Sequence, residues 1–202
     1  MLLVRHGQTP TTGKVLPGRA PGLHLADTGK SQAEAVAERI GALTKVTAVY
    51  ASPLERAKET AAPIAKRLGV KTVIERGLLE CDFGDWTGRE LKDLYKESGW
   101  AGVQRHPSGF RFPHGESFPE MQARIVGAVA KLSERHPGET IVAVSHADPI
   151  KAAVADAVGT PLDLFQRIVI SPCSVTAIAY SLVGPTVLAV NSTGALTELK
   201  PS

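Results

Sequence analysis

The sequence has few cysteines, no long apolar run and no block of charge of one sign, and each absence excludes a class of protein. Two cysteines, Cys81 and Cys173, in 202 residues do not make a disulfide framework, which favours a reducing compartment. No apolar stretch is long enough to cross a bilayer, and the N-terminal residues lack the pattern of a signal peptide. We therefore expect a cytoplasmic protein with no membrane segment.

The overall composition is that of an ordinary folded protein. A formal net charge of +3 with no basic cluster gives no reason to expect a nucleic-acid partner. Hydrophobic residues make up 43% of the chain and charged residues 21%, and the length suffices for one good core. The sequence shows no internal repeat, so we expect a single domain over residues 1–202.

Strand and helix patterns alternate along the chain. Apolar and β-branched runs predict strands at 2–4, 46–51, 71–75 and 140–144, and a hairpin at 175–180 and 187–191. Apolar residues at helical spacing predict helices that begin near Thr28 and Ser52 and that cover 89–96, 118–136 and 149–158. Ser52 and Glu55 are spaced as a capping box for the second of these. This alternation predicts an α/β fold with a mostly parallel central sheet.

Chemically active residues follow two of the predicted strands. Arg5 and His6 follow the first, and His146 follows the strand at 140–144. Ligands of open α/β sheets bind beyond the carboxyl ends of the strands, so we expect these side chains to share a site. Arg56 lies near a helix start, where a cation is better explained if an anion sits nearby. Three acidic residues, Glu80, Asp82 and Asp85, stand among aromatic residues and glycines, a setting that suits a general acid.

Two loop segments and an alternative type of site have more than one interpretation. Residues 11–27 and 98–115 show no clear periodicity, and long loops of this kind are either plain surface or part of a site. His6 and His146 could also ligate a metal with Glu80 or Asp82. Two arginines beside a divalent cation would be electrostatically awkward, which disfavours a metallohydrolase.

The chain resembles the histidine phosphatase superfamily, the phosphoglycerate mutase-like proteins, over most of its length. Six separated motifs carry the resemblance: Arg5-His6-Gly7-Gln8-Thr9, Leu25 with Gly29 and Gln32-Ala33, Ser52-Pro53-Leu54-Glu55-Arg56-Ala57 with Thr60, Leu78 with Glu80, Gly84, Trp86 and Gly88, Gly115-Glu116-Ser117, and Val144-Ser145-His146. The chain departs from the family at Ala26, where the family has Thr, and at Ala147 and Asp148, where it has Gly-Gly or Gly-Asn.

The resemblance implies a three-layer sandwich and assigns roles to particular residues. His6 would attack phosphorus and form a phosphohistidine, and Glu80 would act as general acid and base. Arg5, Arg56 and His146 would hold the transferring phosphoryl group. Substrate-binding positions would be Arg5, Arg56, Thr12, Gly18 and Ala147, with no metal and no cofactor. The expected partner is a small phosphorylated metabolite, and the resemblance also allows a homodimer.

Within this family, hydrolysis of a phosphomonoester competes with phosphoglycerate mutase-type phosphotransfer. Mutases carry an asparagine shortly after the nucleophile, where this chain has Thr12, and a longer basic insertion than residues 98–115 offer. Both departures favour a phosphatase. Asp148 would add an acid that weakens binding of highly charged substrates. A non-catalytic phosphometabolite-binding protein is the alternative from another class, and the complete set of reactive residues argues against it.

Overall fold

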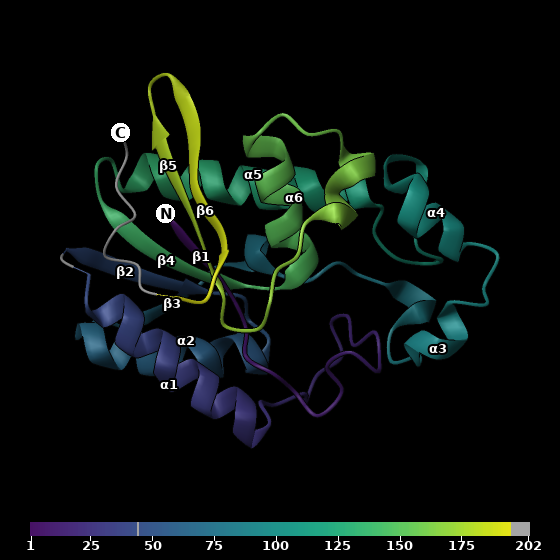
Figure 1. Cartoon of the computed structure of the whole chain (residues 1–202), viewed down its shortest axis with the longest axis horizontal. Helices are drawn as coiled ribbons and strands as arrows, with labels where there is room; N and C mark the ends of the chain where they lie inside the picture. Colours follow the sequence, from purple (N-terminus) through teal and green to yellow (C-terminus); the bar gives the residue numbers. More distant parts are fainter. Residues whose placement is uncertain (44, 195–202) are drawn as a thin grey trace.

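The computed structural model describes residues 1–43 and 45–194, and Figure 1 shows a central sheet with helices packed on both faces. The sheet has six strands in the order β3-β2-β4-β1-β5-β6. Parallel pairing joins the first four in that order, and antiparallel pairing joins β1 to β5 and β5 to β6. The strands are β1 (Leu2–Arg5), β2 (Val46–Ala51), β3 (Thr72–Ile74), β4 (Thr140–Ser145), β5 (Val175–Ser181) and β6 (Gly184–Ser192).

The helices divide between the two faces of the sheet. One face is covered by α1 (Asp27–Gly41) and α2 (Glu55–Leu68), and the other by α5 (Phe118–Arg135) and α6 (Ala147–Ala157). The shorter α3 (Leu91–Leu94) and α4 (Trp100–Arg105) lie to one side of the sheet in Figure 1. Short 3-10 helices cover Arg76–Leu78, Gly84–Trp86, Pro107–Gly109 and Leu162–Arg167.

The alternation of side chains along β1 builds both cores. Leu3 packs into the core beneath α5 and α6, whereas Leu2 and Val4 pack beneath α1 and α2. All three side chains are buried, as expected for a central strand covered on both faces. The predicted α/β architecture with a mostly parallel sheet is therefore confirmed, and each predicted strand has a counterpart within a few residues of the expected bounds.

The helix after β2 starts differently from the prediction. α2 begins at Glu55 with Leu54 at the N-cap, and no side chain caps it. The predicted Ser52–Glu55 capping box is therefore wrong, because the Ser52 hydroxyl has another partner, described below. Residues 98–115 are also more ordered than their sequence suggested, since they hold α4 and the 3-10 helix at Pro107–Gly109. No helix within residues 1–43 and 45–194 combines the length and apolar character that crossing a membrane requires.

Candidate active site

Sheet register places the two strand-end histidines side by side. β1 and β4 are parallel neighbours, and Arg5 lies opposite Ser145. The next residue on each strand is a histidine, so His6 and His146 leave the same edge together, with ring centroids 5.1 Å apart in an edge-to-face arrangement. The carboxyl edge of the parallel strands is thus the candidate site, as the sequence predicted.

His6 is held as a neutral imidazole with one nitrogen available. Its side chain is buried, and Nδ1 donates to the Gly7 carbonyl at 2.7 Å, which leaves the lone pair on Nε2. Nε2 lies 3.3 Å from the Arg56 Nε, which donates to it. Burial, with the charges of Arg56 and Arg5, lowers the pKa of His6 to about 3. A neutral imidazole with an unprotonated Nε2 is the form that can act as a nucleophile.

Two guanidiniums border His6. Arg56 is fully buried, and its Nη2 donates to the Gly18 carbonyl at 2.7 Å. Arg5 donates from Nη1 to the Ile170 carbonyl at 2.6 Å. Burial lowers the pKa of both arginines, and the Glu80 charge opposes that effect. Both remain cations, because arginine does not deprotonate in proteins.

Three buried nitrogens at this edge have no hydrogen-bond partner among the described residues. They are the Nε of Arg5, the Nη1 of Arg56 and the Nδ1 of His146. A buried donor that lacks a partner costs free energy, so such a cluster is expected to meet its partner in a ligand. Two of the three belong to cations, and a phosphoryl group offers the anionic oxygens that suit them.

His146 is fixed from the neighbouring strand. Its ring is fully buried, and Nε2 lies 2.8 Å from the Ser52 hydroxyl, which donates to it when the proton is on Nδ1. Burial, with the positive charges of Arg56 and Arg5, lowers its pKa well below the usual value. Ser52 therefore orients His146 instead of capping α2. Its position directly after β2 was visible in the sequence, but its partner depends on the pairing of β2 with β4.

The helix that follows His146 begins at Ala147. First-turn N–H groups of a helix have no partner within it and carry partial positive charge toward the site. Ala147 is not among the non-glycine residues with positive φ in the described parts of the chain. The replacement of the family's glycine by alanine therefore requires no strained backbone at this position.

Glu80 is set up to hold a proton. Its carboxyl is buried, and Oε1 accepts a hydrogen bond from the Cys81 N–H at 2.9 Å. Burial and the Asp148 charge raise its pKa to about 7, against the opposing charges of Arg56 and Arg5. A carboxyl that titrates near neutral pH can donate a proton and later accept one.

A network that the sequence analysis missed holds the Glu80 backbone. Arg19 Nε and Arg124 Nη2 both donate to the Glu80 carbonyl, at 2.8 and 3.2 Å. Glu116 joins the two arginines, with contacts of 2.8 Å to Arg19 and 2.8 and 2.9 Å to Arg124. Burial opposes the ionisation of Glu116, yet the Arg124 hydrogen bonds hold its pKa below the usual value. The Gly-Glu-Ser motif marked Glu116, but nothing in the sequence linked it to residues 19 and 124.

The remaining predicted substrate-binding positions lie on the loop after β1. Gly18 has a φ of +51° and contributes its carbonyl to Arg56. Thr12 keeps its hydrogen bonds within the loop, because its hydroxyl accepts from the Thr9 N–H at 2.9 Å and lies 3.0 Å from the Thr9 hydroxyl. Gly18 is thus connected to the site by its hydrogen bond with Arg56, whereas the hydrogen bonds of Thr12 stabilise the loop.

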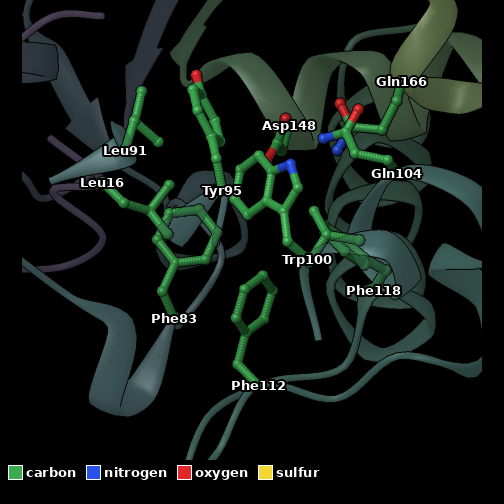
Figure 2. Close-up of a pocket in the computed structure, with 11 residues that line it drawn as sticks. Leu16, Phe83, Leu91, Tyr95, Trp100, Gln104, Phe112, Phe118, Asp148 and Gln166 are labelled. Carbon is green, nitrogen blue, oxygen red and sulfur yellow. The ribbon is translucent and has the colours of Figure 1, made fainter. Parts of the chain in front are cut away.

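An aromatic pocket also lies near this edge (Figure 2). Its volume is ≈ 190 Å³, and its lining includes Asp148 from the first turn of α6. The pocket could not be predicted from the sequence, because its aromatic residues come from segments that are separated in the chain and lack periodicity. No group of three or more His, Cys, Asp or Glu side chains in the described part of the chain is placed to hold a metal ion.

Comparisons with known proteins agree with these features. Phosphoserine phosphatase 1 of Hydrogenobacter thermophilus is 30% identical over 171 residues, 82% of this chain and 79% of that protein. A protein of Cronobacter sakazakii named as a probable phosphoglycerate mutase is 32% identical over 181 residues, 88% of this chain and 83% of that protein.

A solved structure matches the fold over almost its whole length. It is an Entamoeba histolytica phosphoserine phosphatase variant in complex with phosphoserine, which superposes with a TM-score of 0.86 at 25% identity and covers 96% of this chain and 98% of its own. The family model of the histidine phosphatase superfamily (branch 1) matches residues 1–193. With motifs, sheet order and site geometry in agreement, this chain belongs to the histidine phosphatase superfamily, branch 1.

Proposed function

We propose that the protein is a phosphatase that hydrolyses a phosphomonoester through a phosphohistidine on His6. The observation that carries the proposal is a buried, neutral His6 whose unprotonated Nε2 lies beside Arg56, in a site where one nitrogen each of Arg5, Arg56 and His146 lacks a partner among the described residues. A nucleophile next to unpaired anion-binding donors is the arrangement that phosphoryl transfer needs.

In the first step, His6 Nε2 attacks phosphorus and the bond from phosphorus to the ester oxygen breaks. Arg5 and Arg56 neutralise the charge on the transferring group, and the Nδ1 of His146 donates a further hydrogen bond. Protonated Glu80 gives its proton to the departing alcohol oxygen, a contribution of about 10²–10⁴-fold to the rate. The products are a free alcohol, a phosphohistidine and an ionised Glu80.

In the second step, water attacks phosphorus and the bond to His6 breaks. Glu80, now a carboxylate, takes a proton from the water, and inorganic phosphate leaves. The cycle restores neutral His6 and protonated Glu80, so no co-reactant other than water is consumed. The raised pKa of Glu80, about 7, places both of its states within reach near neutral pH, which fits an acid phosphatase of the histidine type.

Mutase-type transfer is the alternative, and the relative named as a probable mutase is the observation that favours it. A mutase must grip a second acidic group on its substrate. Asp148 is the one charged residue that lines the pocket near the site, and it carries the wrong sign for that task. The alternative is tested with 3-phosphoglycerate plus 2,3-bisphosphoglycerate, where a mutase would form 2-phosphoglycerate and a phosphatase would release phosphate.

The first experiment is phosphate release from p-nitrophenyl phosphate, with EDTA present, by the wild type, His6→Ala and His106→Ala. His106 is an exposed histidine that does not contact the site, so it is the matched control. We expect turnover by the wild type and His106→Ala and none by His6→Ala. Rapid quench should trap phosphate on the peptide that contains His6. No phosphate release from any monoester by folded wild type would contradict the proposal.

We further propose that the protein is cytoplasmic, that its partner is a small phosphorylated metabolite, and that it can form a homodimer. Light scattering of the purified protein tests the homodimer.

A further inference from the structure

An aromatic pocket beside the site has no role in the steps above. Its volume is ≈ 190 Å³. In Figure 2, aromatic rings surround its centre, and Gln104 and Gln166 extend beside Asp148 at one end. The rings are those of Phe83, Tyr95, Trp100, Phe112 and Phe118. Asp148 is the one charged side chain in this lining.

Two connections place the pocket against the phosphoryl-binding residues. Leu16 lines it and stands two residues before Gly18, whose carbonyl accepts from Arg56. Phe83 also approaches Gly18, because a Cβ there would meet its ring at 3.2 Å. From the other side, Asp148 stands two residues after His146 in the first turn of α6. The pocket therefore borders the site through both the loop after β1 and the helix after β4.

The chemistry of this lining indicates what it binds, on the condition that the proposed function holds. We propose that the pocket receives the alcohol part of the phosphomonoester, and that it takes an aromatic or branched apolar alcohol that carries no second anionic group. A dry apolar cavity of about 150 Å³ holds benzene. A pocket of ≈ 190 Å³ therefore has room for one ring and a short linker to the ester oxygen.

The charges around the pocket explain why the alcohol should carry no second anionic group. Asp148 Oδ1 pairs with Lys151 at 3.0 Å, and Lys151 also donates to Gln166 at 2.9 Å. Among the described residues, the side-chain hydrogen bonds of Asp148 run through Oδ1 alone. Lysine and arginine are absent from the lining. Because Lys151 is already engaged by Asp148 and Gln166, a carboxylate or second phosphate on the alcohol would lose water and find no unengaged lysine or arginine in the lining to replace it.

The test compares three esters of primary alcohols: 2-phenylethyl phosphate, glycerol 1-phosphate and 3-phosphoglycerate. These have leaving groups of similar kind, so differences in kcat/KM report on binding of the alcohol part. We expect 2-phenylethyl phosphate to exceed glycerol 1-phosphate by roughly tenfold or more, as burial of a ring of that size predicts. We expect 3-phosphoglycerate to be the poorest of the three.

Two variants test the ring and the charge separately. Trp100→Ala removes one wall and should lower kcat/KM for 2-phenylethyl phosphate about tenfold, with a much smaller change for glycerol 1-phosphate. Gln104→Lys adds a cation at an exposed lining residue and should raise kcat/KM for 3-phosphoglycerate. Thr186→Lys, exposed on β6 and outside the pocket, adds the same charge and should change none of the three values.

The outcomes separate this inference from the proposed function. Equal kcat/KM for all three esters, or a preference for 3-phosphoglycerate, would overturn the pocket assignment and leave the phosphatase proposal intact. If no ester releases phosphate, the phosphatase proposal fails, and the pocket assignment is then tested by measuring whether the esters bind. The pocket assignment would be supported if tryptophan fluorescence changes saturably with 2-phenylethyl phosphate but not with 3-phosphoglycerate. An equal response to the two esters would overturn the assignment.

Discussion

Replacing Glu80 by glutamine should make the protein more stable at high pH while it removes catalysis of alkyl esters. The carboxyl is buried, and burial with the Asp148 charge raises its pKa from 4.5 to about 7. Because the folded state holds this proton more tightly than the unfolded chain, the carboxyl stabilises the fold most below pH 4.5. That stabilisation is lost as pH rises toward 7. A glutamine side chain does not titrate, so the stability of the variant lacks this pH dependence.

The size of the effect follows from the two pKa values. Each unit of difference corresponds to about 1.4 kcal/mol, so the whole effect is about 3 kcal/mol. Between about pH 5 and pH 8.5, where the unfolded carboxyl is already partly ionised, roughly 2–3 kcal/mol of it is expressed. The stability of Glu80→Gln relative to the wild type should therefore improve by roughly that amount over this range, or by roughly 5–10 °C in Tm.

The assay is urea unfolding of the wild type and Glu80→Gln at both pH values, in the same salt. Glu139→Gln provides a control that lacks this pH dependence. Hydrogen bonds from Thr47 and His136 lower the pKa of Glu139 below 4.5, so this carboxyl is largely ionised in the folded and the unfolded chain at both pH values, and its loss should change stability by a similar amount at each. A difference between wild type and Glu80→Gln that is the same at both pH values would refute the claim that Glu80 is a buried, protonated acid.

Three further predictions concern the surroundings of the site. The rate of alkyl phosphate hydrolysis should fall as pH rises through about 7 and Glu80 loses its proton. Asp148→Asn should move that fall to lower pH, because it removes a charge that raises the pKa of Glu80. A pH profile of kcat/KM for the wild type and the variant checks both expectations. Ser52→Ala should cost about 1–3 kcal/mol of stability and lower kcat, because it leaves the buried Nε2 of His146 unpaired. An unchanged kcat would show that the Ser52 hydroxyl does not orient the His146 ring. Gly29→Ala should prevent normal folding, because its Cβ would lie 2.0 Å from a backbone carbonyl oxygen; an unchanged circular dichroism melt would contradict this.

The order of strands and helices could be predicted from the sequence because it depends on local pattern. β1 and β4 are short apolar runs, and α5 carries Met121, Ile125 and Leu132 on one buried face. The pairing of His6 with His146 was also within reach, since the carboxyl ends of parallel strands meet at one edge. These inferences needed only periodicity and one rule of sheet topology.

What the sequence could not supply depends on contacts between distant segments. Ser52 matched a capping box, but a buried imidazole on the neighbouring strand is the partner its hydroxyl contacts. Arg19 and Arg124 meet at the Glu80 carbonyl from positions 105 residues apart, with no spacing rule to connect them. The raised pKa of Glu80 likewise comes from burial and from Asp148, which reach it only after folding.

The central position of β1 has a consequence for how the chain acquires its site during synthesis. Among the six strands of the sheet, β1 is synthesised first, yet both of its neighbours, β4 and β5, come from residues 140–145 and 175–181. Until the last third of the chain has emerged, β1 has no strand to pair with and His6 has no burial to lower its pKa. Contacts of such sequence separation slow folding and expose unpaired strand edges meanwhile. A nascent or truncated chain that ends before β4 therefore holds the nucleophile without the surroundings that would make it reactive.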